Sequence, residues 1–181
     1  MSDLASTWLD AARDPTIRAE LEAVYERVAN ATRERRPLCT ASGRCCHFEK
    51  HGHRLYVTGL EAAYTVASLQ DADAKGVMHD PSTREAGDAR AVPASPRVLS
   101  LPQVNAARKR GDCPFLIDNL CSVQGIKPLG CRVYYCDPTA QQWQMDLSEE
   151  CLATIRAIHD RHGIEYRYGE WRGMLERLLT V

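Results

Sequence analysis

The sequence predicts a mainly α-helical single domain with small irregular β elements, built around a cysteine-rich site that two loop segments form. Three observations predict this class. Apolar residues recur at helical spacing in several segments, and strand-like alternation is confined to 54–57 and 164–168. Seven of the eight cysteines fall in two blocks, 39–46 and 113–136, in which turn residues dominate.

The N-terminal segment is expected to form two helices with a hinge between them. Leu4, Trp8 and Leu9 form a short apolar stripe at helical spacing. The dipeptide Asp14-Pro15 then provides an N-cap and a residue suited to the first position of a helix. The second helix is expected to keep one buried stripe and to end before the next proline.

The chain is expected to be one globular unit, because 181 residues with 44% hydrophobic content suffice for one sizeable core. Within that unit we distinguish the N-terminal helices, residues 1–36, from a cysteine-cluster domain, residues 37–181. The division marks where the cysteine pattern begins.

Between the two cysteine blocks the sequence predicts a strand, a helix and a long connection. Residues 54–57 alternate like a strand, and Thr58 and Glu61 have the spacing of a capping box ahead of a helix over roughly 59–70. From 71 to 96, Asp, Ala, Gly, Ser and Pro prevail without a sustained period. This composition indicates a surface excursion that is either a functional lid or an idle insertion.

The second cysteine block is expected to fold through turns. A helix from Pro102 to Gly111 leads into it, and Asp118-Asn119 tolerate the positive φ angles of a two-residue hairpin turn. Cys113 and the other thiols of this block should therefore converge through turns rather than through a helix.

The C-terminal third returns to helical spacing. Asp146-Leu-Ser-Glu149 offers a cap for a helix whose apolar face includes Cys151, which we interpret as a core residue. Residues 164–168 then alternate as a short strand, and 171–178 form a closing amphipathic helix.

Charge and hydropathy limit the classes of partner. With 23 basic and 24 acidic residues the formal net charge is −1, which favours no binding to nucleic acid or to an anionic membrane. No apolar run approaches the ~20 residues of a membrane span, and the first residues lack the apolar stretch of a signal peptide. The expected location is the cytoplasm.

A reducing cytoplasm favours metal ligation or redox chemistry over a disulfide framework for these cysteines. The expected partner is accordingly a metal ion or a metal cluster. The candidate ligands are the seven cysteines of the two blocks: Cys39, Cys45, Cys46, Cys113, Cys121, Cys131 and Cys136.

Two questions about the ligands stay open in the sequence. Cys45 and Cys46 are adjacent, and in an extended segment their side chains would diverge, so one of them would bind while the other supports the site or reaches a second metal. His47, His51 and His53 are further possible ligands, although three histidines around a glycine also suit an exposed polar turn.

The pattern of both blocks resembles a known family. Its residues are Cys39, Ser42, Cys45 and Cys46 in the first block, then Cys113-Pro114-Phe115-Leu116, Cys121 and Lys127-Pro128-x-x-Cys131-Arg132-x-Tyr134 in the second. On these residues the chain resembles the CxxCxxCC cysteine-cluster proteins, called YkgJ-like. The resemblance implies chelation of zinc or iron, and one branch of the family resembles flagellin lysine methylases. Ser42 and Lys127 depart from the family pattern, which has cysteine and arginine there.

The sequence predicts the metal and the function less specifically than it predicts the ligands. Wide cysteine spacing favours an iron–sulfur cluster over Zn²⁺, for which closely spaced cysteine pairs are typical. The leading hypothesis is a cysteine-cluster metalloprotein with an electron-transfer or metal-handling role. The alternatives are an enzyme that uses the cluster region as its active site and an interaction module with a structural zinc. No Gly-rich nucleotide-binding fingerprint accompanies the cysteines.

Overall fold

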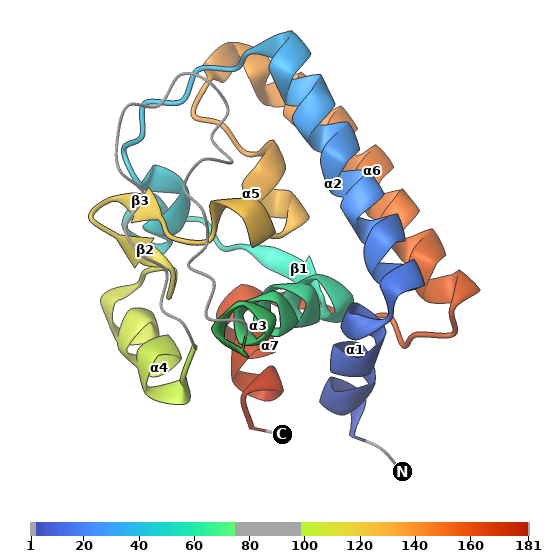
Figure 1. Ribbon diagram of the computed structural model, residues 1–181. Coiled ribbons are helices and arrows are strands. Elements are labelled where there is room, and N and C mark those ends of the chain that lie inside the picture. Colours follow the sequence, from blue (N-terminus) through green and yellow to red (C-terminus); the bar gives the residue numbers. More distant parts are fainter. Residues whose placement is uncertain (1–2, 75–98, 181) are drawn as a thin grey trace.

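The computed structural model describes residues 3–74 and 99–180 and confirms a mainly helical fold. About two thirds of the structure is helical, with two small antiparallel sheets (Figure 1). The α-helices in the described ranges are α1 (Leu4–Arg13), α2 (Pro15–Arg35), α3 (Gly59–Ala74), α4 (Leu101–Arg110), α5 (Leu129–Val133), α6 (Gln141–Arg161) and α7 (Trp171–Leu178). The strands there are β1 (Tyr56–Thr58), β2 (Leu116–Ile117), β3 (Leu120–Cys121) and β4 (Tyr168–Glu170).

The hinge between α1 and α2 is confirmed. The Asp14 carboxylate accepts hydrogen bonds from the backbone N–H groups of Thr16 at 2.8 Å and Ile17 at 3.1 Å, and Pro15 occupies the first helical position. On α1, the fully buried Trp8 lies against Gly59 at the start of α3, where the indole leaves no room for a Cβ atom. This close approach explains why a glycine begins α3.

The two longest helices, α2 and α6, run side by side in opposite directions (Figure 1). A single cluster of buried apolar side chains joins them to α1, α3 and α7. Its largest fully buried members are Trp8, Leu21, Phe48, Leu60, Phe115, Ile155, Ile158, Trp171 and Leu175. The core therefore draws on residues from both 1–36 and 37–181.

Both sheets are antiparallel ribbons of two strands. In the first, β1 pairs with β4 so that Val57 lies opposite Gly169, which ties the start of α3 to the start of α7. In the second, β2 and β3 form the expected hairpin, in which Asp118 and Asn119 have φ angles of 49° and 64°. The second strand expected at 164–168 was placed too early, because β4 begins at Tyr168.

Two helix boundaries differ from the sequence expectation by several residues. The helix predicted over 59–70 continues to Ala74, and the rest of the 71–96 excursion lies outside the described residues. The helix expected to start at Asp146 begins at Gln141 instead. It starts earlier because the buried Gln144 side chain binds the Tyr135 backbone through both its oxygen, at 3.0 Å, and its nitrogen, at 3.2 Å.

A buried carboxylate fixes the short helix α5. Glu61 completes the predicted capping box with Thr58, whose N–H and hydroxyl donate to Oε2 at 2.9 and 3.0 Å. Its other oxygen, Oε1, accepts the backbone N–H of Leu129 at 2.8 Å. Burial raises the pKa of Glu61 above its ordinary value. One carboxylate thus serves the first turns of two helices, α3 and α5.

Replacing Glu61 with alanine is expected to lower the free energy of unfolding by about 3 kcal/mol, because the N–H of Leu129 and the Thr58 side chain lose their buried acceptor. Urea unfolding followed by circular dichroism measures the change. Glu34→Ala, at an exposed position on α2, is the control and should alter the unfolding free energy by less than about 0.5 kcal/mol. Equal effects of the two variants would contradict the role of Glu61.

Candidate metal centre

Backbone hydrogen bonds hold the two cysteine blocks together. The N–H of Cys113 donates to the carbonyl of Cys46 at 2.8 Å, and the N–H of Glu49 donates to Gly111 at 3.0 Å. Gly43, with φ of 70°, packs on the hairpin turn so closely that a Cβ atom would lie 3.0 Å from the Asn119 backbone. The first block therefore folds back onto the second, and the positive φ of Gly43 is a conformation that glycine adopts without strain.

His47 strengthens this junction. Its Nδ1 lies 2.8 Å from the Asp112 carboxylate, and its Nε2 lies 3.0 Å from the Asn119 side-chain oxygen. The hydrogen bonds to Asn119 and Asp112 raise the pKa of His47, because both acceptors favour the doubly protonated imidazolium. Both ring nitrogens are occupied, so His47 links the blocks instead of offering a free metal ligand.

Four thiols converge at the junction. Cys46, which is buried, lies beside the side chains of Cys45, Cys113 and Cys121, and all three influence its pKa. The Sγ atoms of Cys45 and Cys46 lie 4.0 Å apart. The expectation that these two side chains diverge is wrong, because Arg44–Cys46 forms a turn of 3₁₀-helix instead of an extended segment. We call Cys45, Cys46, Cys113 and Cys121 the thiol cluster.

The thiol cluster shares its protons unevenly. Hydrogen bonding with Cys113, Cys121 and Cys45 raises the pKa of Cys46, since its one S–H proton is shared among the neighbouring sulfurs. The hydrogen bond with Cys46 lowers the pKa of Cys45 to about 6 and that of Cys121 to about 7. Near neutral pH the cluster therefore combines a protonated thiol with thiolates, and the thiolate is the form that binds metals.

Cys131 lies at the edge of this cluster on the first turn of α5. The expectation that all thiols of the second block converge through turns is wrong for this residue. Burial and the negative charges of Cys113 and Cys121 raise its pKa. Lys127 opposes that shift, and it also favours the thiolates of Cys45 and Cys121.

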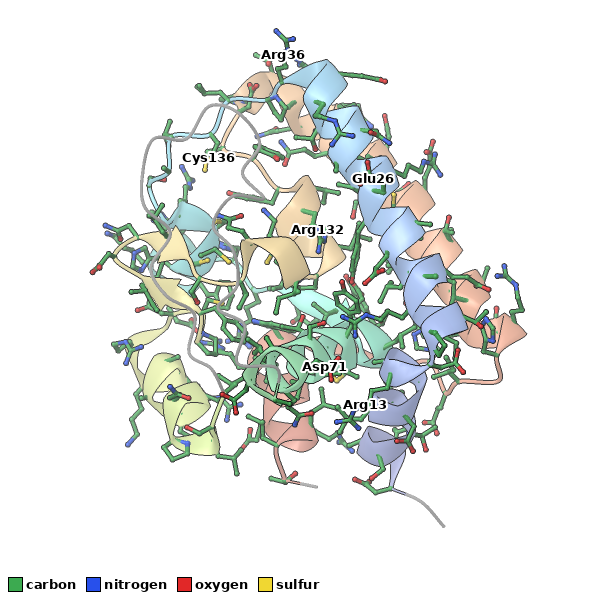
Figure 2. The ribbon with its side chains drawn as sticks, in the orientation of Figure 1. Arg13, Glu26, Arg36, Asp71, Arg132 and Cys136 are labelled. Carbon is green, nitrogen blue, oxygen red and sulfur yellow. The ribbon has the colours of Figure 1, made fainter. Side chains whose placement is uncertain are left out.

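Arg132 holds the loop that carries Lys127. Its Nε donates to the Lys127 carbonyl at 2.6 Å and its Nη2 to the Gly125 carbonyl at 2.8 Å. Its guanidinium also stacks over the Tyr25 ring, 4.0 Å from the centroid, so that Arg132 points from α5 toward α2 (Figure 2). The cysteine-rich loops are thereby attached to the helical pair.

The other cysteines lie apart from the thiol cluster. Cys39 is exposed, and no hydrogen bond joins its side chain to another thiol within 3–74 and 99–180. Cys136 lies on the loop after α5 (Figure 2), and burial together with the nearby Cys136 raises the pKa of Tyr134. Cys151 is fully buried among apolar residues of α6, which confirms it as a core residue. The ligand role of Cys39 and Cys136 stays a prediction.

The described side chains form no group of three or more Cys, His, Asp or Glu residues already arranged around one metal position. Of the histidines, His53 stacks on Tyr134 with its Nε2 3.3 Å from the carbonyl of Cys45. The four sulfur donors of the thiol cluster are of the type that soft metal ions prefer. Rotation of the cysteine side chains would direct the four sulfurs toward one metal position.

Two contributors were not recognised in the sequence. The sequence does not identify Asp112, because nothing in its spacing links it to His47, which lies far away in the chain. Glu61 was recognised only as a helix cap, since its second bond, to Leu129, depends on tertiary structure. The Cys113-Pro114 and Lys127-Pro128 segments were the available signals for this region.

Comparison of the chain with known protein families, curated proteins and solved structures returns no match in any of the three.

Among the helices that the structure describes, none combines the length and the apolar character needed to cross a membrane.

The His47 contacts predict a pH dependence for the metal-free protein. Because the pKa of His47 is raised above 6.5, its contribution to stability is complete below that pH and is lost as the pH rises through the folded-state pKa. The difference in unfolding free energy between the wild type and His47→Ala should therefore shrink from about pH 5.5 to about pH 8.5.

His51→Gln is the matched control for this experiment. Partial desolvation and the charge of Arg44 lower the pKa of His51, so its contribution appears above pH 6.5 and is lost as the pH falls. The two variants should thus show opposite slopes in denaturant titrations across the same pH range. Parallel slopes would show that Asp112 and Asn119 do not hold the His47 imidazolium.

Proposed function

We propose that the thiol cluster binds a single tetrahedral metal ion through sulfur, with Zn²⁺ as the ion that fits best. The observation that carries this proposal is the contact of Cys46 with three other thiols, of which Cys45 lies 4.0 Å away. Four sulfurs about 2.3 Å from one zinc ion stand about 3.8 Å from each other. The separation of Cys45 and Cys46 thus approaches the edge of such a tetrahedron.

Electrostatics support the same proposal. Cys46 and Cys113 are buried in the apolar core, and the low pKa values of Cys45 and Cys121 place negative charge beside them. Thiolates held this close repel each other, and one Lys127 ammonium offsets only part of that repulsion. A divalent cation would balance the charge and accept all four sulfurs.

A zinc ion in this place would fasten the two cysteine blocks together as a closed structural site. The protein's own contribution is the prior alignment of the blocks by the hydrogen bonds from Cys113 to Cys46 and from His47 to Asp112. This alignment reduces the ordering that metal binding must impose.

Iron–sulfur binding, which the cysteine spacing favours, is the second candidate. One observation favours it: Cys131 lies close enough to Cys113 and Cys121 to sense their charge, which gives a fifth thiol beyond the four of one zinc ion. In a [4Fe–4S] cluster each thiolate binds a different iron atom, so the sulfurs would have to stand further apart than they do at Cys45 and Cys46. We therefore place this candidate after zinc.

We further propose that the chain functions in the reducing cytoplasm and is related to the cysteine-cluster proteins that it resembles. Unpaired thiols at Cys45, Cys46, Cys113, Cys121 and Cys131 support both statements. Cys39 and Ser42 of the family pattern lie on the loop before the thiol cluster. An enzymatic use of the site, with the 71–96 excursion as a lid, stays a prediction.

Substitution of the cluster cysteines tests the ligand set. Cys46→Ser and Cys113→Ser should each reduce bound metal to less than about 0.2 equivalents per chain, because three thiolates and a hydroxyl hold zinc weakly. Cys39→Ser and Cys151→Ala are the controls and should retain the wild-type content. Elemental analysis of protein purified without chelators gives the result.

The proposed ligand set would be contradicted by metal loss in the Cys39→Ser variant, or by full metal content in Cys46→Ser. Circular dichroism of every variant separates ligand loss from unfolding.

The identity of the metal is tested by colour and reduction. Anaerobically purified protein should be colourless and hold about one zinc per chain, since zinc is redox-silent and has no visible absorption. Visible spectra before and after dithionite, together with iron and sulfide assays, provide the measurement. A brown protein that bleaches on reduction would reject zinc and establish the iron–sulfur candidate.

A further inference from the structure

Basic side chains lie at the exposed edge of the thiol cluster. Arg44 directly precedes the exposed Cys45, and Lys50 and His51 are exposed on the following 3₁₀ turn. Partial desolvation and the charges of Arg44 and Lys50 lower the pKa of His51, which shows that the three groups lie close together.

The neighbouring carboxylates do not neutralise these cations. Glu49 pairs with Arg172 at 3.1 Å, and Asp112 pairs with His47 at 2.8 Å. Within the part of the chain that the structure describes, neither Arg44 nor Lys50 forms an ion pair. The edge of the cluster therefore carries two permanent positive charges, those of Arg44 and Lys50, which no carboxylate of the described residues pairs with.

An aromatic surface adjoins the charges. The His53 and Tyr134 rings stack 5.9 Å apart at an angle of 13°, and Tyr134 is 38% exposed. The His53 ring reaches the carbonyl of Cys45 at 3.3 Å, so the stack borders the exposed thiol. Aromatic and arginine side chains together are typical of protein–protein contact surfaces.

We propose that the exposed edge of the thiol cluster is a docking surface for an acidic segment of a partner protein. The surface consists of Arg44, Lys50, His51, His53 and Tyr134, and a segment bound to it would lie over Cys45. We call these residues the cationic edge. The proposal rests on the proposed metal site and supplies its partner, because a protein docked here would reach the exposed ligand of that site. Charge of this kind steers encounter and produces transient complexes that salt weakens.

The chemistry of the surface favours an acidic protein over other anions. Two permanent cations are far fewer than the roughly 6–10 phosphate contacts typical of nucleic-acid binding, and the chain as a whole has a net charge of −1. Two hollows of the described residues, of about 270 and 190 Å³, lie along α2, and Cys45 lines neither of them. The cationic edge is thus an exposed surface suited to an extended acidic chain.

A capped hexaglutamate peptide tests this inference with the full chain, in metal-loaded and metal-free forms. NMR titration at low salt should show shifts at residues 44–54 and at Tyr134 that vanish as salt increases. Arg44→Gln combined with Lys50→Gln should weaken binding roughly tenfold. Lys109→Gln combined with Arg177→Gln removes the same charge from exposed positions on α4 and α7 and should leave binding unchanged.

Several results would overturn the docking surface. They are equal affinity of the two double variants, equal binding of a hexaglutamine peptide, or tighter binding of a thymidine oligonucleotide than of hexaglutamate. The single variant Arg44→Lys keeps the charge and should retain binding, which controls for damage to the turn. Peptide binding and metal content are measured separately. A protein that holds metal but does not bind the peptide rejects only the docking surface, and a protein that binds the peptide but holds no metal rejects only the metal site.

Discussion

The contact between Cys46 and Cys113 is the interaction on which this structure depends most. A backbone hydrogen bond of 2.8 Å joins the two residues, which come from distant parts of the chain, and the Cys113 thiol influences the pKa of Cys46. Both are buried in the same apolar core as the helices. The blocks are therefore aligned by ordinary packing and hydrogen bonding, and a metal would add to a junction that already exists.

Buried polar side chains link that junction to the helices. Glu61 binds the first turn of α5 from α3, and Arg132 on α5 holds the loop of Lys127 while it stacks on Tyr25 of α2. Each of these groups satisfies backbone groups that an irregular loop would otherwise leave without partners. Loops rich in turns can thus hold a fixed geometry, which a metal site requires.

Local signals in the sequence predicted much of the fold. The cap at Asp14, the capping box of Thr58 and Glu61, and the hairpin turn at Asp118 each depend on neighbouring residues alone, and all three are confirmed. The buried position of Cys151 followed from helical spacing. Boundaries failed where tertiary contacts decide them, as at Gln144, whose amide binds the backbone of Tyr135 and moves the start of α6.

The candidate site was predictable in composition but not in arrangement. Spacing identified the cysteines, yet it could not show that a 3₁₀ turn brings Cys45 and Cys46 together or that Cys39 is exposed and apart from them. These features depend on how Gly43 packs on the hairpin. The convergence of the thiols is a property of tertiary structure, and it is the ground on which we propose Zn²⁺ ahead of an iron–sulfur cluster.

X-ray absorption at the metal edge of the purified full-length protein tests the central claim most directly, because it counts the atoms bound to the metal. The account predicts a zinc edge and a shell of four sulfur atoms about 2.3 Å from the ion, with no second metal nearby. A shell made only of nitrogen and oxygen atoms would contradict the thiolate site of Cys45, Cys46, Cys113 and Cys121.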